Sequence, residues 1–201
     1  LGSVLFIGFK SLAFGCAAFA AAGFFAWKAG RSGLPEAPPW SRTDTFALLG
    51  LLVFAALLRL PFIGTFFTGL QIDEANSILD SASIARGEFF SPFRTVWGGN
   101  PSFSHFFLAG IIPVFGSSVT VAKTLAAVTS LVALLYFYRW IRFYVSTAPA
   151  FVASFLFAVS WWHLFYALSP FHNIFEMALE VAALFYMEKA LRKGRRDDAW
   201  L

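Results

Sequence analysis

Long apolar runs alternate with short polar intervals along this chain. Five of the runs approach the ~20 residues that a helix needs to cross a bilayer. They occupy residues 4–27, 44–63, 119–141, 147–168 and 174–191. Each is predominantly apolar over its whole length and does not alternate, so the pattern predicts membrane-spanning helices.

A sixth apolar run, FSHFFLAGIIPVF at 103–115, is shorter than the others. A segment of this length more often lies along the membrane interface or re-enters than crosses it. Pro113 is expected to break a helix near its end. We therefore expect 103–115 to be a short helix that does not span the membrane.

The composition agrees with a membrane location. Of the 201 residues, 59% are hydrophobic and 13% are charged, against about 25% charged in an average soluble domain. The formal net charge of +4 could suggest nucleic acid, but the basic residues gather at the ends of apolar runs. We expect an all-α integral membrane protein surrounded by membrane lipids, with no nucleic-acid partner.

The distribution of charge predicts an orientation, because Lys and Arg favour the cytoplasmic side. Basic residues cluster in the intervals 28–43, 139–146 and 189–196, which we assign to the cytoplasm. Interval 64–102 is rich in Asp and Glu, and the turn at 168–174 has no Lys or Arg, so both are assigned to the outside. These assignments agree only if 103–115 does not cross, which leaves about five crossings with the N-terminus outside.

Two parts of the chain are expected. Residues 1–43 form an N-terminal membrane helix and a cytoplasmic linker, which contains GRSGLPEAPP. Residues 44–201 form the N-terminal part of a membrane domain whose outward loop covers 64–118 and carries juxtamembrane amphipathic helices.

The outward loop begins with GLQIDEANSILDSASIARGE at 69–88. Apolar residues recur near helical spacing, which predicts a short amphipathic helix on the outer membrane surface. Gly87 supplies a stop signal. Asp73 and Glu74 would occupy the first turn, where acidic residues stabilise a helix by ~0.3–1 kcal/mol.

A functional interpretation of the same pair stands beside that structural one. A carboxylate at the membrane surface can act as a general base toward an acceptor nucleophile. It can also help to hold a divalent cation against a phosphate. The residue types alone leave these alternatives open.

Several motifs occur in an order that resembles one enzyme family. They are Arg59-Leu60-Pro61-Phe62, Gly69, Asp73-Glu74-Ala75, Ala85-Arg86-Gly87, Gly99-Asn100-Pro101, Trp161-Trp162-His163-Leu164-Phe165 and Phe171-His172-Asn173-Ile174. Over about 44–198 the chain resembles the polyprenol-phosphate-sugar glycosyltransferases of the C-type fold. That group includes the protein O-mannosyltransferases of glycosyltransferase family 39 and the lipid A aminoarabinose transferases.

The resemblance implies a membrane glycosyltransferase that uses a polyprenyl-phosphate sugar as donor. Its acceptor is a protein, lipid or glycan on the extracytoplasmic side of the membrane. We expect this membrane to be a bacterial inner membrane. Asp73 matches the family's catalytic acidic position, where it would deprotonate the acceptor in an inverting reaction, and Glu74 is its neighbour in the motif. The resemblance also implies that 103–115 is a juxtamembrane helix.

Further residues are candidates for binding the donor phosphate or substrate, because cationic and polar groups stabilise a leaving phosphate. They are Arg59, Arg86, His105, His172 and Asn173. Simpler alternatives are snorkelling for Arg59, a solvated face for Arg86 and an interfacial position for His105. His163, flanked by aromatic residues, is expected at the membrane–water interface.

The second outward turn departs from many relatives, which carry an acidic residue where His172 and Asn173 stand. Glu176 could supply the missing carboxylate or simply begin the next helix. Asp73 and Glu176 are therefore the candidate metal ligands, and a divalent cation is the only candidate cofactor.

The alternative to an enzyme is a non-catalytic or truncated membrane scaffold derived from the same family. Five crossings fall short of the roughly seven-helix core that the resemblance implies. We therefore expect these 201 residues to be inactive by themselves.

Overall fold

The computed structural model describes residues 36–64, 72–88 and 103–193, and in these ranges every regular element is a helix. The longer helices are α2 (Arg42–Leu57), α5 (Val119–Ile141), α6 (Thr147–Val159) and α8 (His172–Lys193). The shorter ones are the 3₁₀ turn η1 (Leu60–Phe62), α3 (Ile72–Ala85), α4 (Phe103–Phe115) and α7 (Trp161–Ala167). The all-helical architecture predicted from the sequence is confirmed.

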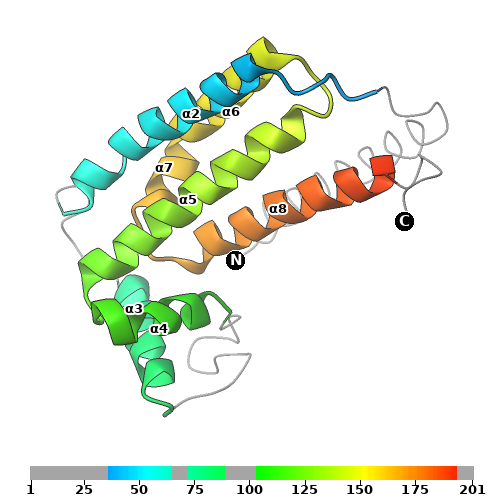
Figure 1. Ribbon diagram of the computed structural model, residues 1–201. Helices are drawn as coiled ribbons and strands as arrows, with labels where there is room; N and C mark the ends of the chain where they lie inside the picture. The colour runs from blue at the N-terminus through cyan, green and yellow to red at the C-terminus, as the bar shows by residue number, and fades with distance from the viewer. Residues whose placement is uncertain (1–35, 65–71, 89–102, 194–201) are drawn as a thin grey trace, which may run out of the picture. The chain divides into compact units, whose positions relative to one another are not determined.

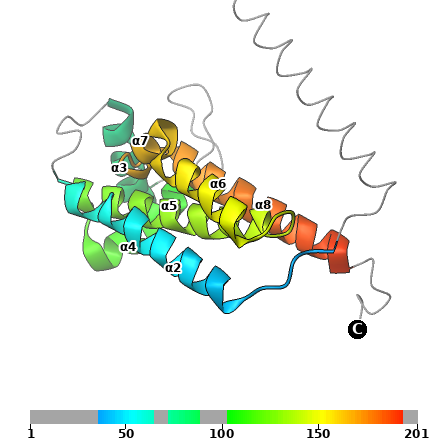
Figure 2. The same cartoon turned by 90° about the horizontal axis from the view of Figure 1, so that it is seen from above.

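Helix α5 is the centre of the bundle. It packs against α8 on one side and against α2, α6 and α7 elsewhere, as Figure 1 shows. Seen from above in Figure 2, α2 and α8 lie on opposite sides of α5 and α6. The short helices α3 and α4 pack on each other at one end of the bundle, and α4 also contacts α5 and α8.

Small residues form the contacts between the long helices. Ala55, Ala126, Ala133, Ala150 and Ala158 are fully buried. Inside a membrane no hydrophobic force pulls helices together, so small side chains favour association by letting backbones approach closely.

Large apolar side chains of α2 face away from the bundle. Phe46, Leu49, Val53 and Leu57 recur at helical spacing and are more than half exposed. A helix with apolar residues on both its packed and its exposed faces is typical of a membrane span.

By length and hydropathy, two described helical segments can cross a membrane, Arg42–Phe62 and Val119–Ile141. A third is possible if α6 and α7, which are bent by 59° at their break, count as one span. Helix α8 has the length of a span but carries four charged residues in its first 18, Glu176, Glu180, Glu188 and Lys189. The predicted span at 4–27 lies outside the described residues, and the total of five crossings stays a prediction.

The bundle has two chemically different ends. One, which we call the acidic end, holds α3, α4, the turn 168–171 and the start of α8. The other, the basic end, holds the start of α2, the end of α5, the turn 142–146 and the end of α8. Helix α4 begins and finishes at the acidic end, as expected for a segment that does not cross.

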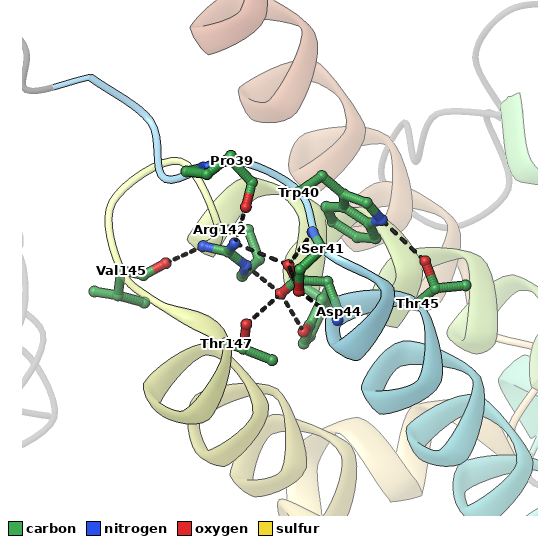
Figure 3. A network of polar contacts seen from close by, with 9 residues as sticks. Pro39, Trp40, Ser41, Asp44, Thr45, Arg142, Val145 and Thr147 are labelled. Carbon is green, nitrogen blue, oxygen red and sulfur yellow. Dashed lines mark hydrogen bonds and ion pairs between the residues drawn. The ribbon is translucent and has the colours of Figure 1, made fainter.

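A buried ion pair joins three helices at the basic end (Figure 3). Arg142 donates to Asp44 through Nε at 2.5 Å and through Nη2 at 3.0 Å, and both side chains are at most 5% exposed. Thr147 and Tyr138 also donate to the same carboxylate, at 2.7 and 3.2 Å. Because every oxygen of Asp44 is satisfied, the charge is tolerated and α2 is held to α5 and α6.

Local sequence explains where α2 begins. Ser41 caps the helix by accepting from the backbone N–H of Asp44, while the Asp44 carboxylate accepts from the backbone N–H of Ser41. This reciprocal capping box satisfies two backbone donors that the first turn would otherwise leave unpaired.

Candidate active site

Helix α3 carries the acidic pair, and its boundaries agree with those predicted. It ends in a Schellman motif, in which Gly87 donates to the carbonyl of Ile84 and Glu88 to that of Ser83. Gly87 has a φ of +73°, a conformation that favours glycine. The predicted stop at this position is confirmed.

The two acidic residues have different environments. Asp73 is exposed, whereas the Glu74 side chain is only 3% exposed. Consecutive residues of a helix point about 100° apart, so only one of them can face the rest of the bundle. Glu74 takes that place.

Glu74 contacts the second loop of the acidic end. Its Oε1 accepts a hydrogen bond from the hydroxyl of Ser169, which lies in the turn between α7 and α8 and is also buried. Residues 95 positions apart are thereby joined. The contact places the DE motif beside the 168–174 turn, at the same end of the bundle, as the charge distribution predicted.

The Asp73 carboxylate is available for chemistry. Within the described ranges it forms no hydrogen bond or ion pair, and only its backbone carbonyl is used, as acceptor from Ser77 at 2.9 Å. An exposed carboxylate next to a buried, bonded one suits a residue that must exchange a proton with a substrate.

The faces of α3 only partly match the amphipathic pattern. Ile72 and Leu79 are more than 60% exposed, as expected for a surface that meets lipid. Asp80, however, is buried with Glu74 on the packed side. Helix α4 and the turn at Ser169 cover that side, which the periodicity of α3 alone cannot reveal.

A small polar cavity lies between α3, α4 and the start of α8. It has a volume of about 10 Å³ and is lined by Ser77, Ser81, Ser104, His105 and Phe175 together with residues of α5 and Pro170. That is about the space of one water molecule. His105 is 8% exposed and faces the protein interior. It therefore does not take the interfacial position that was the simpler alternative for it.

Arg59 is fully buried where α2 ends. Its guanidinium donates to the carbonyls of Ala55 and Ala158, at 2.9 and 2.8 Å, and lies 3.1 Å from Nδ1 of His163. The carbonyl of Ala158 belongs to the last turn of α6, just before the bend into α7. Arg59 therefore binds the broken span and does not snorkel to the surface.

His163 is also fully buried, although an interfacial position was expected. Its ring stacks on Phe157 with centroids 4.2 Å apart. The bend at Ser160 turns this residue inward, because Ser160 has an extended backbone and caps α7 by accepting from His163 N–H. A continuous helix through 147–168, as the apolar run predicted, would have pointed it elsewhere.

The remaining candidate site residues lie at the acidic end. Arg86 is exposed and forms an ion pair with Glu88 at 2.7 Å, which lowers the pKa of the Glu88 carboxyl. His172 and Asn173 are half-buried at the start of α8, and Glu176 is exposed one turn later.

Among the described residues no group of three or more His, Cys, Asp or Glu is arranged to hold a metal ion. Asp73 and Glu176 are both exposed carboxylates at the acidic end. Metal binding by this pair stays a prediction.

Two residues of this end were not singled out from the sequence. Lys123 of α5 is 4% exposed and is the only charged residue between positions 119 and 138, a signal that marks functional candidates in membrane spans. Ser169 is an ordinary turn residue in the sequence, and only the folded chain brings it to Glu74.

The chain matches a protein-family model. A model described as dolichyl-phosphate-mannose-protein mannosyltransferase matches residues 100–201, which include α4 to α8 and begin after the DE motif. Neither a curated protein nor a solved structure matches significantly.

Proposed function

Because the chain belongs to the dolichyl-phosphate-mannose-protein mannosyltransferase family, we propose that it is part of a membrane glycosyltransferase that uses a polyprenyl-phosphate sugar as donor. The acceptor is a protein, lipid or glycan. A relation to the lipid A aminoarabinose transferases is part of this proposal and rests on the order of the motifs.

The main observation that supports the proposal is that Asp73 and Glu74 have different environments. Glu74 is buried and bonded to Ser169, so it is suited to holding α3 in place. Asp73 is exposed in the same turn and has a carboxylate that can meet an acceptor. We assign Asp73 as the general base and Glu74 as a positioning residue.

The reaction proposed is a single displacement with inversion. The Asp73 carboxylate takes the proton of the acceptor hydroxyl as its oxygen attacks the anomeric carbon. The bond between that carbon and the phosphate oxygen breaks, and the polyprenyl phosphate leaves with the electron pair. Cationic or hydrogen-bonding groups near the leaving phosphate would lower the barrier, and the candidates are Arg59, Arg86, His105, His172 and Asn173.

The buried state of Arg59 gives it a distinct place among these candidates. Its guanidinium has two backbone acceptors and a histidine but no carboxylate among the described residues. A buried cation that no described carboxylate neutralises would create a positive potential around the end of α2 and the bend between α6 and α7, which would favour an anionic leaving group even without direct contact.

The acidic end is proposed to face the outside of a bacterial inner membrane, since the basic clusters lie at the opposite end. A divalent cation at Asp73 and Glu176 is a further element of the proposal. Chelation of divalent ions during the transfer assay would test it, since unchanged activity after chelation contradicts a requirement for a divalent cation.

The central experiment measures sugar transfer in membranes from cells that express the full-length protein. Asp73→Asn keeps the size of the side chain but removes the base, and activity should fall by about 10²- to 10⁴-fold. Glu88→Gln is the matched control, because it removes another exposed carboxylate of the same loop. Wild-type activity in Asp73→Asn would exclude Asp73 as base, whereas a wild-type protein without transfer to any acceptor would favour the scaffold alternative.

A further inference from the structure

A second candidate site lies at the basic end, away from the residues proposed for catalysis. It is a pocket of about 220 Å³ between the segment before α2, the end of α5 and the end of α8. Its charged lining residues are Arg139, Arg142 and Lys189, and its aromatic ones are Trp40, Phe143 and Phe185. Every charged group in the lining is a cation.

The three cations are not equivalent. Arg142 is 5% exposed. Its guanidinium donates to the carboxylate of Asp44 and to backbone carbonyls, including that of Pro39 at 3.0 Å. Arg139 and Lys189 are exposed, and within the described ranges their side chains form neither a hydrogen bond nor an ion pair. These two positive charges of the lining therefore have no hydrogen-bond acceptor among the described residues.

Two aromatic rings hold the guanidinium of Arg139. Its central carbon lies 5.0 Å from the ring centre of Phe185 and 6.0 Å from that of Trp40. Contact of this kind stabilises the cation through the faces of the rings. The N–H groups at the edge of the guanidinium remain available, and their fork geometry matches two oxygens of a phosphate.

The position of the pocket indicates which kind of phosphate-bearing ligand can reach it. Trp40 lies two residues before the candidate span Arg42–Phe62, and Arg139 lies in the last turn of the candidate span Val119–Ile141. The pocket is therefore at the depth of the lipid headgroups, where Trp residues are also enriched.

Exposed apolar side chains lie beside this end of the bundle, on the parts of α2 and α8 that run toward the middle of the membrane. Phe46 and Leu49 of α2 are 72% and 53% exposed, and Tyr186 and Met187 of α8 are 53% and 54% exposed. A lipid can use such surface for its acyl chains, whereas a free phosphate ion cannot.

We propose that the pocket lined by Arg139, Lys189, Trp40 and Phe185 binds the phosphodiester headgroup of an anionic phospholipid. Basic pockets between helix ends bind such headgroups by charge and hydrogen bonding. The bound lipid would join the segment before α2 to α5 and α8. This site is separate from donor binding, and it stands whether or not the chain transfers sugars.

The test uses the full-length protein, purified in detergent, with lipid binding measured by native mass spectrometry. The probes are phosphatidylglycerol and phosphatidylcholine with the same acyl chains. Arg139→Gln and Lys189→Gln should each weaken phosphatidylglycerol binding by about fivefold, and the double variant by about 25-fold. Phosphatidylcholine binding should change little in any variant.

Two further variants separate charge from geometry. Arg139→Lys keeps the charge but loses the planar fork, so its loss should be smaller than that of Arg139→Gln. Arg42→Gln is the matched control, because Arg42 is exposed at the same end but does not line the pocket. It should bind phosphatidylglycerol within twofold of the wild type.

Three results would overturn the proposal. One is unchanged phosphatidylglycerol binding in both single Gln variants, provided that circular dichroism shows wild-type helix content. Another is an equal loss in Arg42→Gln, which would indicate general surface attraction. The third is displacement of phosphatidylglycerol by millimolar inorganic phosphate, which would make a free anion the ligand.

Discussion

The hydroxyl of Ser169 donates a hydrogen bond to the carboxylate of Glu74, and both side chains are almost completely buried. This contact joins the helix that carries the acidic pair to the turn between α7 and α8. The contact gives Glu74 and Asp73 different roles, because a carboxylate that holds two segments together cannot also be free to meet a substrate.

We expect the Glu74–Ser169 contact to contribute measurably to stability. Ser169→Ala removes a donor from a buried carboxylate, which typically costs about 1–3 kcal/mol. Thermal denaturation in detergent of Ser169→Ala, Glu74→Ala and the double variant forms a double-mutant cycle, for which we expect a coupling of at least ~1 kcal/mol. The pair Ser169→Ala and Glu88→Ala, which share no contact, should be additive, and additivity in the first pair would contradict the role of this bond.

Sugar transfer should also respond to Ser169→Ala, although Ser169 is not proposed to touch substrate. If the hydroxyl positions α3, activity should fall less than in Asp73→Asn, because the base itself is retained. Purified or membrane-embedded protein assayed over a range of acceptor concentrations gives kcat and KM separately. A loss as deep as that of Asp73→Asn would argue for a direct chemical role of Glu74 or Ser169.

The ion pair of Asp44 with Arg142 should be among the most sensitive positions for stability. Removing one partner of a buried pair leaves an uncompensated charge, at a cost of about 3–5 kcal/mol. We therefore expect Asp44→Ala to lower the thermal transition strongly. Arg86→Gln breaks an ion pair whose side chains are more than half exposed to solvent, so it should lower the thermal transition far less. Similar losses in the two variants would contradict the structural role given to Asp44.

The bend between α6 and α7 should depend on the contact of His163 with Arg59. His163→Phe keeps a ring that can stack on Phe157 but removes the nitrogen near the guanidinium. We expect a loss of ~1–3 kcal/mol, because a buried donor loses a partner. Trp162→Phe, at a neighbouring position that is 54% exposed, is the control. No difference between the two variants would show that the contact does not stabilise the bend.

Two glycines should respond to alanine in opposite directions. Gly87 has a positive φ, so Gly87→Ala should destabilise the end of α3 by about 1–2 kcal/mol. Gly110 lies within α4, and a methyl group there meets no atom within 4 Å. Gly110→Ala should therefore stabilise the protein by ~0.5–1 kcal/mol. Thermal denaturation of both variants gives the sign, and a gain for Gly87→Ala would contradict the assigned cap.

The helices themselves could be predicted from the sequence because they depend on local and one-dimensional properties. Continuous apolar runs predicted α2, α5 and α8, and the length of 103–115 predicted a helix that stays at one end. The acidic first turn and Gly87 located α3 at both boundaries. In a membrane the backbone must satisfy its own hydrogen bonds, so an apolar run of sufficient length has almost no alternative to a helix.

The tertiary structure decided what each polar side chain does. The sequence marked Asp73 and Glu74 as a pair, but burial of one of them depends on α4 and on Ser169, which are distant along the chain. It likewise marked Arg59 as a group near the surface, whereas the bend after α6 supplies carbonyl and imidazole partners in the interior. Such partners are set by the packing of helices against each other, which the periodicity of any single helix does not contain.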